Sequence, residues 1–129
     1  MRSWTDREGP VHLSVLNYLR TVLHGAVVHH SPNAFGMAGA DVARQIAKHK
    51  HMGMVPGFPD LLALTFHGPL FFEVKAEGGL SEAQKAFHAD LRRMNYRVAV
   101  VRCVEDVRCA LAEWGIPTRE SHPTGELMP

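Results

Sequence analysis

Three charged residues interrupt an otherwise apolar stretch near the middle of the chain. They are Asp60, Glu73 and Lys75, all within residues 57–75. Two runs of strand-forming residues on either side of His67-Gly68-Pro69 predict an antiparallel β-hairpin. Side chains alternate along a strand, so Glu73 and Lys75 share one face. Antiparallel pairing brings the end of the second strand back beside the start of the first, so we expect Asp60 close to both.

Two carboxylates and an ammonium group in an apolar sheet predict a metal site. Carboxylate oxygens are ligands that Mg²⁺ prefers, and a bound cation offsets the cost of taking these charges out of water. Lys75 could then stabilise an anion such as a phosphate, or orient an attacking water. The alternative is a structural Asp–Lys or Glu–Lys pair, which is common at strand ends. The hairpin residues alone leave both interpretations open.

The pairing register of the hairpin bears directly on the metal site. A three-residue turn would put Asp60 opposite Ala76, on the face away from Glu73. A four-residue turn would put Asp60 opposite Lys75, with all three charged groups on one face. A shared metal requires the second arrangement, or a β-bulge with the same effect. We therefore predict the longer turn or a bulge.

The wider sequence resembles a known nuclease family. Pro59-Asp60 followed by Glu73-Val74-Lys75 is similar to the signature of the PD-(D/E)XK nuclease superfamily. The fuller pattern resembles its VRR-NUC domain branch, and it comprises Gly57-Phe58-Pro59-Asp60-Leu61, Phe72-Glu73-Val74-Lys75-Ala76, Leu80-Ser81 and Gln84. The resemblance spans roughly residues 8–114. It implies an α/β fold with a restriction-endonuclease-like core, in which helices flank a central mixed β-sheet.

The resemblance also implies roles for individual residues. Asp60 and Glu73, with the Val74 carbonyl, would hold Mg²⁺ or Mn²⁺, and Lys75 would act on the attacking water or the transition-state charge. Glu8, near the start of the first helix, would join the metal site. Its alternative role is structural, because an acid is favourable at a helix N-terminus. Gln84 would contribute to catalysis from the first turn of its helix.

Ser81 and Gln84 also fit a capping box, in which the two side chains bond reciprocally to the backbone at a helix start. That structural role alone explains both residues. It is compatible with a catalytic one, since the helix cap and the site would share the same end of the helix. We expect this helix to bury Ala83, Phe87, Leu91 and Met94.

A basic helix over residues 40–51 precedes the Pro-Asp element, where a phosphate backbone would pass. Such a charged face is commonly only solvated, but contacts to phosphate and sugar dominate protein–DNA hydrogen bonds. We expect DNA contacts from this helix, from the asparagine that the family places after its first strand, and from the helix cap. The residues are Arg44, Lys48, Lys50, Asn33 and Ser81.

The remaining periodicity predicts helices over 11–23 and 105–114 and strands over 26–31 and 97–103. Pro10 suits the first turn of the first helix, and Gly25 its end. The predicted order is helix, strand, helix, hairpin, helix, strand, helix. We assign residues 1–115 to a single VRR-NUC-like nuclease domain and residues 116–129, with three prolines, to a flexible tail.

Composition limits the classes of function. A chain of 129 residues forms one domain, and a net charge of +1 excludes a uniformly basic DNA-coating protein. No apolar run approaches the length of a membrane span, and the N-terminus lacks a signal-peptide core. Cys103 and Cys109 fall in apolar patterns and are expected to be buried thiols. We therefore expect a cytoplasmic protein without a membrane partner.

Together these features predict a Mg²⁺- or Mn²⁺-dependent DNA endonuclease. Small standalone members of the family, typically carried by phages and prophages, resemble Holliday junction resolvases, so we expect a branched substrate. Two symmetric cuts across a four-way junction need two active sites, which predicts a homodimer. The alternatives are a monomeric nickase or flap nuclease, and a catalytically silent DNA-binding module.

Overall fold

The structure is a computed structural model, and it describes residues 5–31 and 41–121. Asn33 lies outside the described residues. The elements follow the predicted order, with one short 3₁₀ helix added at the end. They are α1 (Thr5–Val22), β1 (Val27–His30), α2 (Val42–His51), β2 (Leu61–Thr65), β3 (Gly68–Val74), α3 (Glu82–Arg93), β4 (Arg97–Val101), α4 (Val104–Glu113) and η1 (Arg119–Ser121).

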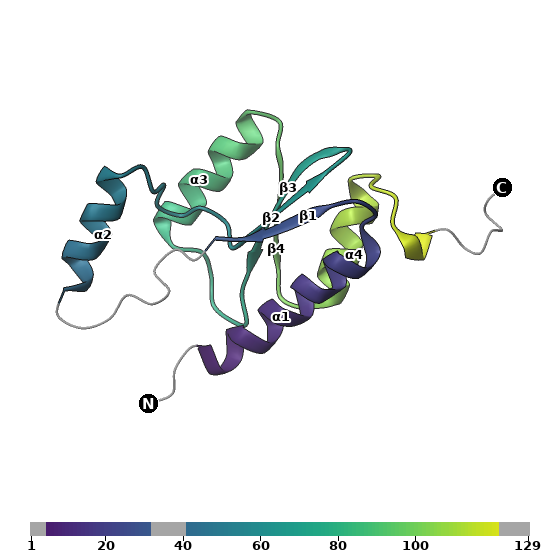
Figure 1. Ribbon diagram of the computed structural model, residues 1–129, viewed down its shortest axis with the longest axis horizontal. Helices are drawn as coiled ribbons and strands as arrows, with labels where there is room; N and C mark the ends of the chain where they lie inside the picture. Colours follow the sequence, from purple (N-terminus) through teal and green to yellow (C-terminus); the bar gives the residue numbers. More distant parts are fainter. Residues whose placement is uncertain (1–4, 32–40, 122–129) are drawn as a thin grey trace.

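The four strands form one mixed sheet in the order β1-β2-β3-β4. The β1–β2 and β2–β3 pairs are antiparallel, whereas β3 and β4 are parallel. Helices α1 and α4 cover one face of the sheet and α3 covers the other (Figure 1). This arrangement confirms the predicted α/β fold with a central mixed sheet flanked by helices. None of the helices in the described residues is both long and apolar enough to cross a membrane.

The core lies on both faces of the sheet because side chains alternate along β3. Phe72 packs with residues of α1 and α4, including Leu19 and Leu111, in the larger apolar cluster. Phe71 points the other way and packs in a smaller cluster with Leu91 of α3 and with Phe58. The smaller cluster holds the segment before β2 against α3, which positions the start of β2.

The hairpin turn is shorter than predicted. Thr65 pairs with Gly68, so the strands are joined by Phe66 and His67 alone. The Thr65 hydroxyl accepts the His67 N–H at 2.9 Å and donates to the Gly68 carbonyl at 2.9 Å, which closes the turn locally. The prediction of a longer turn or a bulge was therefore wrong, because a side-chain hydrogen bond stabilises the two-residue connection.

The observed register nevertheless brings the two acids to the same face. The last pair of the β2–β3 ladder is Leu61 with Phe72. One further step along both chains puts Asp60 opposite Glu73, and directly opposed residues of an antiparallel pair share a face. The convergence of the two carboxylates was correctly expected, although the register that produces it was not.

Helix α1 begins earlier than the sequence pattern indicated. It starts at Thr5, so Pro10 lies inside the helix and not in its first turn. Proline removes one intrahelical hydrogen bond, which is tolerated near a helix end. Glu8 therefore lies within α1 and not just ahead of it. Gly25 follows the helix with φ of +71°, as expected for a residue that ends a helix.

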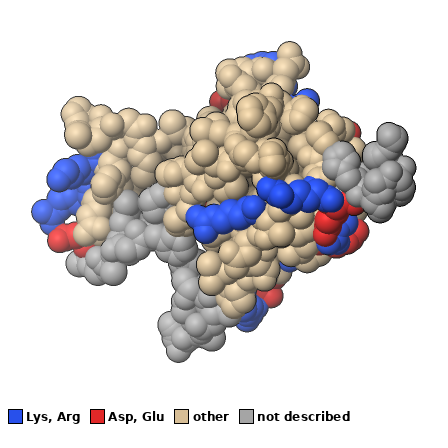
Figure 2. Space-filling model, turned by 45° about the vertical axis from the view of Figure 1, so that its right-hand side comes forward, with Lys and Arg blue, Asp and Glu red and all other residues tan. Residues whose placement is uncertain are grey.

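Helix α2 stands apart from the rest of the described chain (Figure 1). It contains no buried residue, although its apolar and polar residues fall on different sides. Its last turn carries Lys48, His49, Lys50 and His51. Basic atoms gather over this helix at the left of Figure 2.

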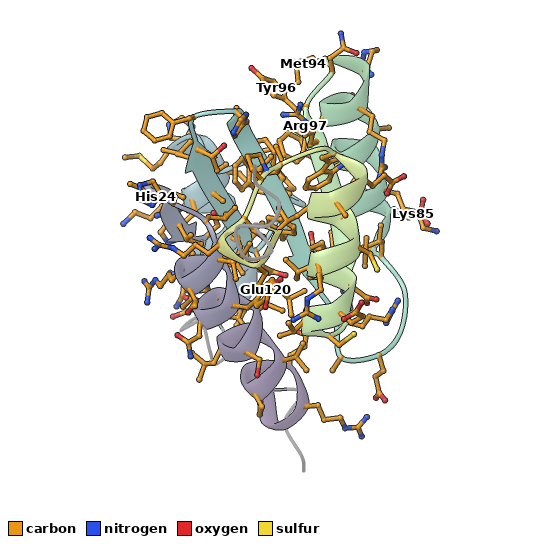
Figure 3. The ribbon with its side chains drawn as sticks, turned by 90° about the vertical axis from the view of Figure 1, so that its right-hand side faces the viewer. His24, Lys85, Met94, Tyr96, Arg97 and Glu120 are labelled. Carbon is orange, nitrogen blue, oxygen red and sulfur yellow. The ribbon has the colours of Figure 1, made fainter. Side chains whose placement is uncertain are left out.

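Helix α3 packs the predicted Phe87 and Leu91 into the smaller apolar cluster, but not Ala83 or Met94. Its buried residues are His88 and Leu91, whereas Ala83 is exposed and Met94 is 53% exposed. Met94 projects at the C-terminal end of the helix, and Lys85 points to solvent from its outer side (Figure 3). The helix is rotated so that residues four apart, Gln84 and His88, face β3 together.

The segment from residue 116 onward was expected to be a flexible tail. Ile116 is buried in the larger cluster, and Glu120 lies between α1 and α4 (Figure 3). The Tyr18 hydroxyl donates to Glu120 at 2.7 Å, and Arg108 also bonds to it. Residues 122–129 lie outside the described residues.

The two cysteines differ from expectation. Cys103 and Cys109 are both exposed free thiols, where burial was predicted. Cys103 caps α4, and Cys109 lies on its outer side, so neither contributes to the core.

Gly57 sets the distance between the segment before β2 and the start of α3. Its φ is +80°, and a Cβ there would lie 2.4 Å from the Ala83 carbonyl oxygen. Gly78 is a matched control, because its φ is +83° and a Cβ there would approach nothing in the described chain within 4 Å. We predict that Gly78→Ala lowers the free energy of unfolding by about 1–2 kcal/mol through its backbone conformation alone. Gly57→Ala should lose about 1–3 kcal/mol more, because the clash adds to that strain.

Urea unfolding of both variants measures this difference. Equal losses for the two variants would show that Gly57 is required only for its backbone angle.

Candidate active site

Asp60 is held at the start of the central strand β2 by its side chain and its backbone. Its Oδ2 accepts the Val74 backbone N–H at 2.8 Å, which ties the carboxylate to the end of β3. Its carbonyl accepts the Ser31 N–H at 2.8 Å, so the residue continues the pairing of β2 with the end of β1. These bonds keep the carboxylate at one position beside β3.

Glu73 is buried beside Asp60, with only 1% of its surface exposed. Both of its carboxylate oxygens have partners from α3. Gln84 Nε2 donates to Oε2 at 3.1 Å, and His88 Nε2 lies 3.2 Å from Oε1. Glu73 also shares a hydrogen bond with the Asp60 carboxyl group. The two acids are therefore adjacent.

The Gln84 side chain is oriented by the cap of α3. Ser81 N–H donates to Gln84 Oε1 at 2.8 Å, and the Ser81 hydroxyl accepts the Gln84 backbone N–H at 3.1 Å. The predicted capping box is confirmed. Because Oε1 is held by the cap, the amide NH₂ of Gln84 must face Glu73. The cap and the contact to Glu73 thus use opposite ends of one amide group.

The electrostatics around Glu73 disfavour its charged form. Burial is the largest cause, and the hydrogen bond and negative charge of Asp60 add to it, which together raise the pKa of Glu73 to about 9. The nearby Lys75 ammonium acts in the opposite direction but is outweighed. Metal-free Glu73 is therefore protonated at neutral pH, with Asp60 as its neighbour.

Glu8 reaches the same region from α1. Burial, aided by the charge of Asp60, raises the pKa of Glu8, while Lys75 and a hydrogen bond from the Ala76 backbone N–H lower it. Glu8, Asp60 and Val74 line a cavity of about 320 Å³ together with His12 and His30. The rings of these two histidines meet edge to face, with centroids 4.7 Å apart. The structure thus gathers four predicted site residues, Glu8, Asp60, Glu73 and Lys75, at one end of β3.

The chemistry of these donors fits a hard divalent cation. The predicted ligands, which are the Asp60, Glu73 and Glu8 carboxylates and the Val74 carbonyl, all offer oxygen, and this suits Mg²⁺ or Mn²⁺ rather than zinc. Within the described residues, no group of three or more acidic, histidine or cysteine side chains has metal-binding geometry. A pair of carboxylates is sufficient for Mg²⁺, which retains several waters. Without a metal, Glu73 retains a proton. A cation held by Asp60 and Glu73 would allow both carboxyl groups to ionise.

The residues predicted to contact DNA are only partly brought together. Lys50 of α2 lines a groove of about 290 Å³ with Ser81 and Gln84, so one basic residue lies across from the cap of α3. Arg44 forms an ion pair with Asp41 on the exposed side of α2. Lys48 belongs to the last turn of the same helix.

His88 is a site residue that the sequence analysis missed. It lies one turn after Gln84, so helical spacing would have put both residues on one face. The set of residues predicted to face inward from α3 followed apolar residues only, and it therefore did not include His88. Burial and the neighbouring charge of Arg92 lower the pKa of His88, so the imidazole is neutral.

Comparisons with family models and with solved structures both find the same domain family. The family model described as "VRR-NUC domain" matches residues 4–105. A solved structure described as "VRR_NUC domain protein" is similar, with a TM-score of 0.62 and 25% sequence identity. That similarity covers 88% of this chain and 90% of the other. No curated protein matches the chain.

The raised pKa of Glu73 predicts how the stability of the metal-free protein depends on pH. Folding raises this pKa from about 4.5 to about 9, so the stabilisation is complete below pH 4.5 and is lost as the pH rises through 9. We predict that the free energy of unfolding in EDTA falls across this window by at most about 1.4 kcal/mol per pH unit. Glu73→Gln removes the titration, so this variant should gain stability relative to the native protein as the pH rises.

Urea unfolding of both proteins at intervals between pH 5 and 9 measures the effect. Parallel pH profiles for the two proteins would contradict the prediction.

Proposed function

This chain belongs to the VRR-NUC domain family of PD-(D/E)XK nucleases, and we propose that it is a metal-dependent endonuclease that hydrolyses phosphodiester bonds in DNA. One observation carries the proposal. Asp60 lies beside the buried Glu73, whose surroundings strongly disfavour a second negative charge, with the Lys75 ammonium close by. A structural ion pair at a sheet edge would not need a second carboxylate in that position.

Asp60 and Glu73, with the Val74 carbonyl and Glu8, would hold Mg²⁺ or Mn²⁺. When bound, such a cation polarises the phosphodiester and lowers the pKa of a coordinated water. Asp60 is suited to this role because the Val74 N–H fixes the orientation of its carboxylate beside Glu73. Glu8 would contribute from α1, where the Ala76 N–H holds it beside β3.

Lys75 would supply the positive charge that catalysis requires. Its backbone N–H donates to the Val101 carbonyl at 3.0 Å, so β4 fixes the strand from which the ammonium extends. An ammonium group in this position can orient the attacking water and stabilise the charge that develops on the phosphate. Gln84 would hold Glu73 in place while it ionises.

The DNA backbone would pass along the groove between α2 and the start of α3. Lys50 on one side and Ser81 on the other supply a cation and polar groups suited to phosphate oxygens. Arg44 and Lys48 would extend this contact along the exposed side of α2, and Asn33 would add to it. A helix without buried residues has the freedom to adjust to the duplex.

We further propose that the substrate is a branched DNA, a four-way junction, cut by a homodimer in the cytoplasm. Paired cuts across a junction require two symmetric active sites. Light scattering with and without junction DNA measures the assembly, and a panel of junction, flap and linear duplexes measures the substrate preference. A strictly monomeric mass in both conditions would favour a nickase or flap nuclease over a junction resolvase.

Cleavage should depend on Asp60 and Lys75 but not on comparable charges elsewhere. Asp60→Asn keeps an oxygen for the Val74 N–H and so preserves the fold, while it removes a charged metal ligand. We predict that Lys75→Ala reduces the rate about 10²–10³-fold, the range for losing one group that stabilises transition-state charge, and that Asp60→Asn reduces it at least as much.

Plasmid relaxation with Mg²⁺ or EDTA measures these rates. Asp90→Asn and Lys85→Ala, on exposed parts of α3, serve as matched controls. Near-native cleavage by either site variant would refute the assignment, and DNA binding without any cleavage by the native protein would identify a silent binding module.

The basic face of α2 should contribute affinity without sequence preference. Each phosphate contact adds about 0.9 to the slope of log affinity against log salt concentration. We predict that replacing Arg44, Lys48 and Lys50 together by alanine weakens junction binding equally for different sequences and lowers this slope. Fluorescence anisotropy at several salt concentrations measures both quantities, with the triple variant of Arg20, Lys85 and Arg93 as the control. An unchanged slope would mean that α2 is only a solvated face.

A further inference from the structure

Glu73 and His88 stand out from all other side chains in the described residues. They are the two polar or charged residues that are buried, each 1% exposed, and they contact each other. Every other polar side chain that the structure describes retains some access to solvent. The burial of His88 therefore belongs with the burial of Glu73.

The placement of His88 on α3 gives it a specific geometric relation to Glu73. His88 and Gln84 are one helical turn apart, and their side chains approach different oxygens of the same carboxylate, at 3.2 and 3.1 Å. With its proton on Nε2, the imidazole donates to Oε1 while the amide donates to Oε2. Two donors on one rigid helix fix the carboxylate plane, which a single donor would leave free to rotate.

Stability alone does not account for a histidine at this position. Its other ring nitrogen, Nδ1, is buried and has no hydrogen-bond partner among the described residues. A buried polar atom without a partner is unfavourable. A methionine would fill similar space without that penalty. The contact that His88 does make, to Glu73, is therefore its evident contribution.

We propose that His88 is a positioning residue, which together with Gln84 orients Glu73 toward Asp60 for binding a shared divalent cation. This proposal rests on the proposed metal-dependent function. Outer partners of this kind fix the orientation of metal-binding carboxylates, and their removal typically weakens metal affinity 10–100-fold. His88 acts through Glu73 and need not contact the DNA.

Two substitutions separate positioning from packing. His88→Gln places an amide donor near the position of Nε2, whereas His88→Met keeps the volume and removes the donor. His67→Met, in the exposed hairpin turn, is the control. Calorimetric titration with Mn²⁺, in the absence of DNA, measures metal affinity directly, and urea unfolding measures stability.

We expect His88→Met to bind Mn²⁺ about 10–100-fold more weakly than the native protein, with an unfolding midpoint that is unchanged or higher. His88→Gln should remain within about threefold of native affinity, because it restores the donor. The Mn²⁺ concentration for half-maximal cleavage should shift in parallel with the measured affinity.

Four results would overturn the proposal. Native affinity in His88→Met, or equal loss in both variants, would show that the donor is not responsible. Lower stability of His88→Met with unchanged affinity of the folded protein would identify a packing role. If the native protein itself binds no Mn²⁺, the metal-dependent function fails first and the role of His88 with it, which the native titration alone reveals.

Discussion

The contact between the buried carboxyl group of Glu73 and the half-buried carboxylate of Asp60 is the constraint on which the rest of this structure depends. Two ionised acids in contact at the ends of neighbouring strands repel each other, and removing them from water makes that repulsion stronger. The fold supplies donors and one cation from separate elements. The Val74 backbone holds Asp60, α3 holds Glu73, and Lys75 lies beside them. None of these groups allows both acids to ionise together, since Glu73 keeps its proton despite them, and this is the reason that we propose a metal cation here.

The mixed sheet explains why these groups can meet. The antiparallel pairing of β2 with β3 brings Asp60 opposite Glu73, although they are distant in sequence, and the parallel strand β4 fixes the end of β3 through the Lys75 N–H. The two apolar clusters hold a helix on each face of the sheet near these strand ends. Helix α1 carries Glu8 on one face, and α3 carries Gln84 on the other. Glu8 thus approaches from one layer and Gln84 from the other.

Sequence patterns predicted the order of elements and the residues that converge, because strand alternation and helical spacing are local properties. They did not predict the hairpin register, since the hydrogen bonds of Thr65 that close a two-residue turn have no signal in hydrophobicity. The buried face of α3 was predicted only in part, because a histidine counts as polar in an apolar pattern and His88 was therefore not among the residues expected inside. Both failures arose where a specific hydrogen bond prevailed over apolar periodicity, and the second of them lies in the site itself.

The capping box of α3 has a consequence for the motions of the protein. Gln84 bonds to Ser81 with its carbonyl oxygen and to Glu73 with its amide, so one side chain belongs both to the helix terminus and to the site. Fraying of the first helical turn therefore releases Oε2 of Glu73, and a ligand that stabilises the orientation of Glu73 also suppresses fraying. Slow exchange of backbone amide hydrogens at the start of α3 would thus report that the site around Glu73 is occupied.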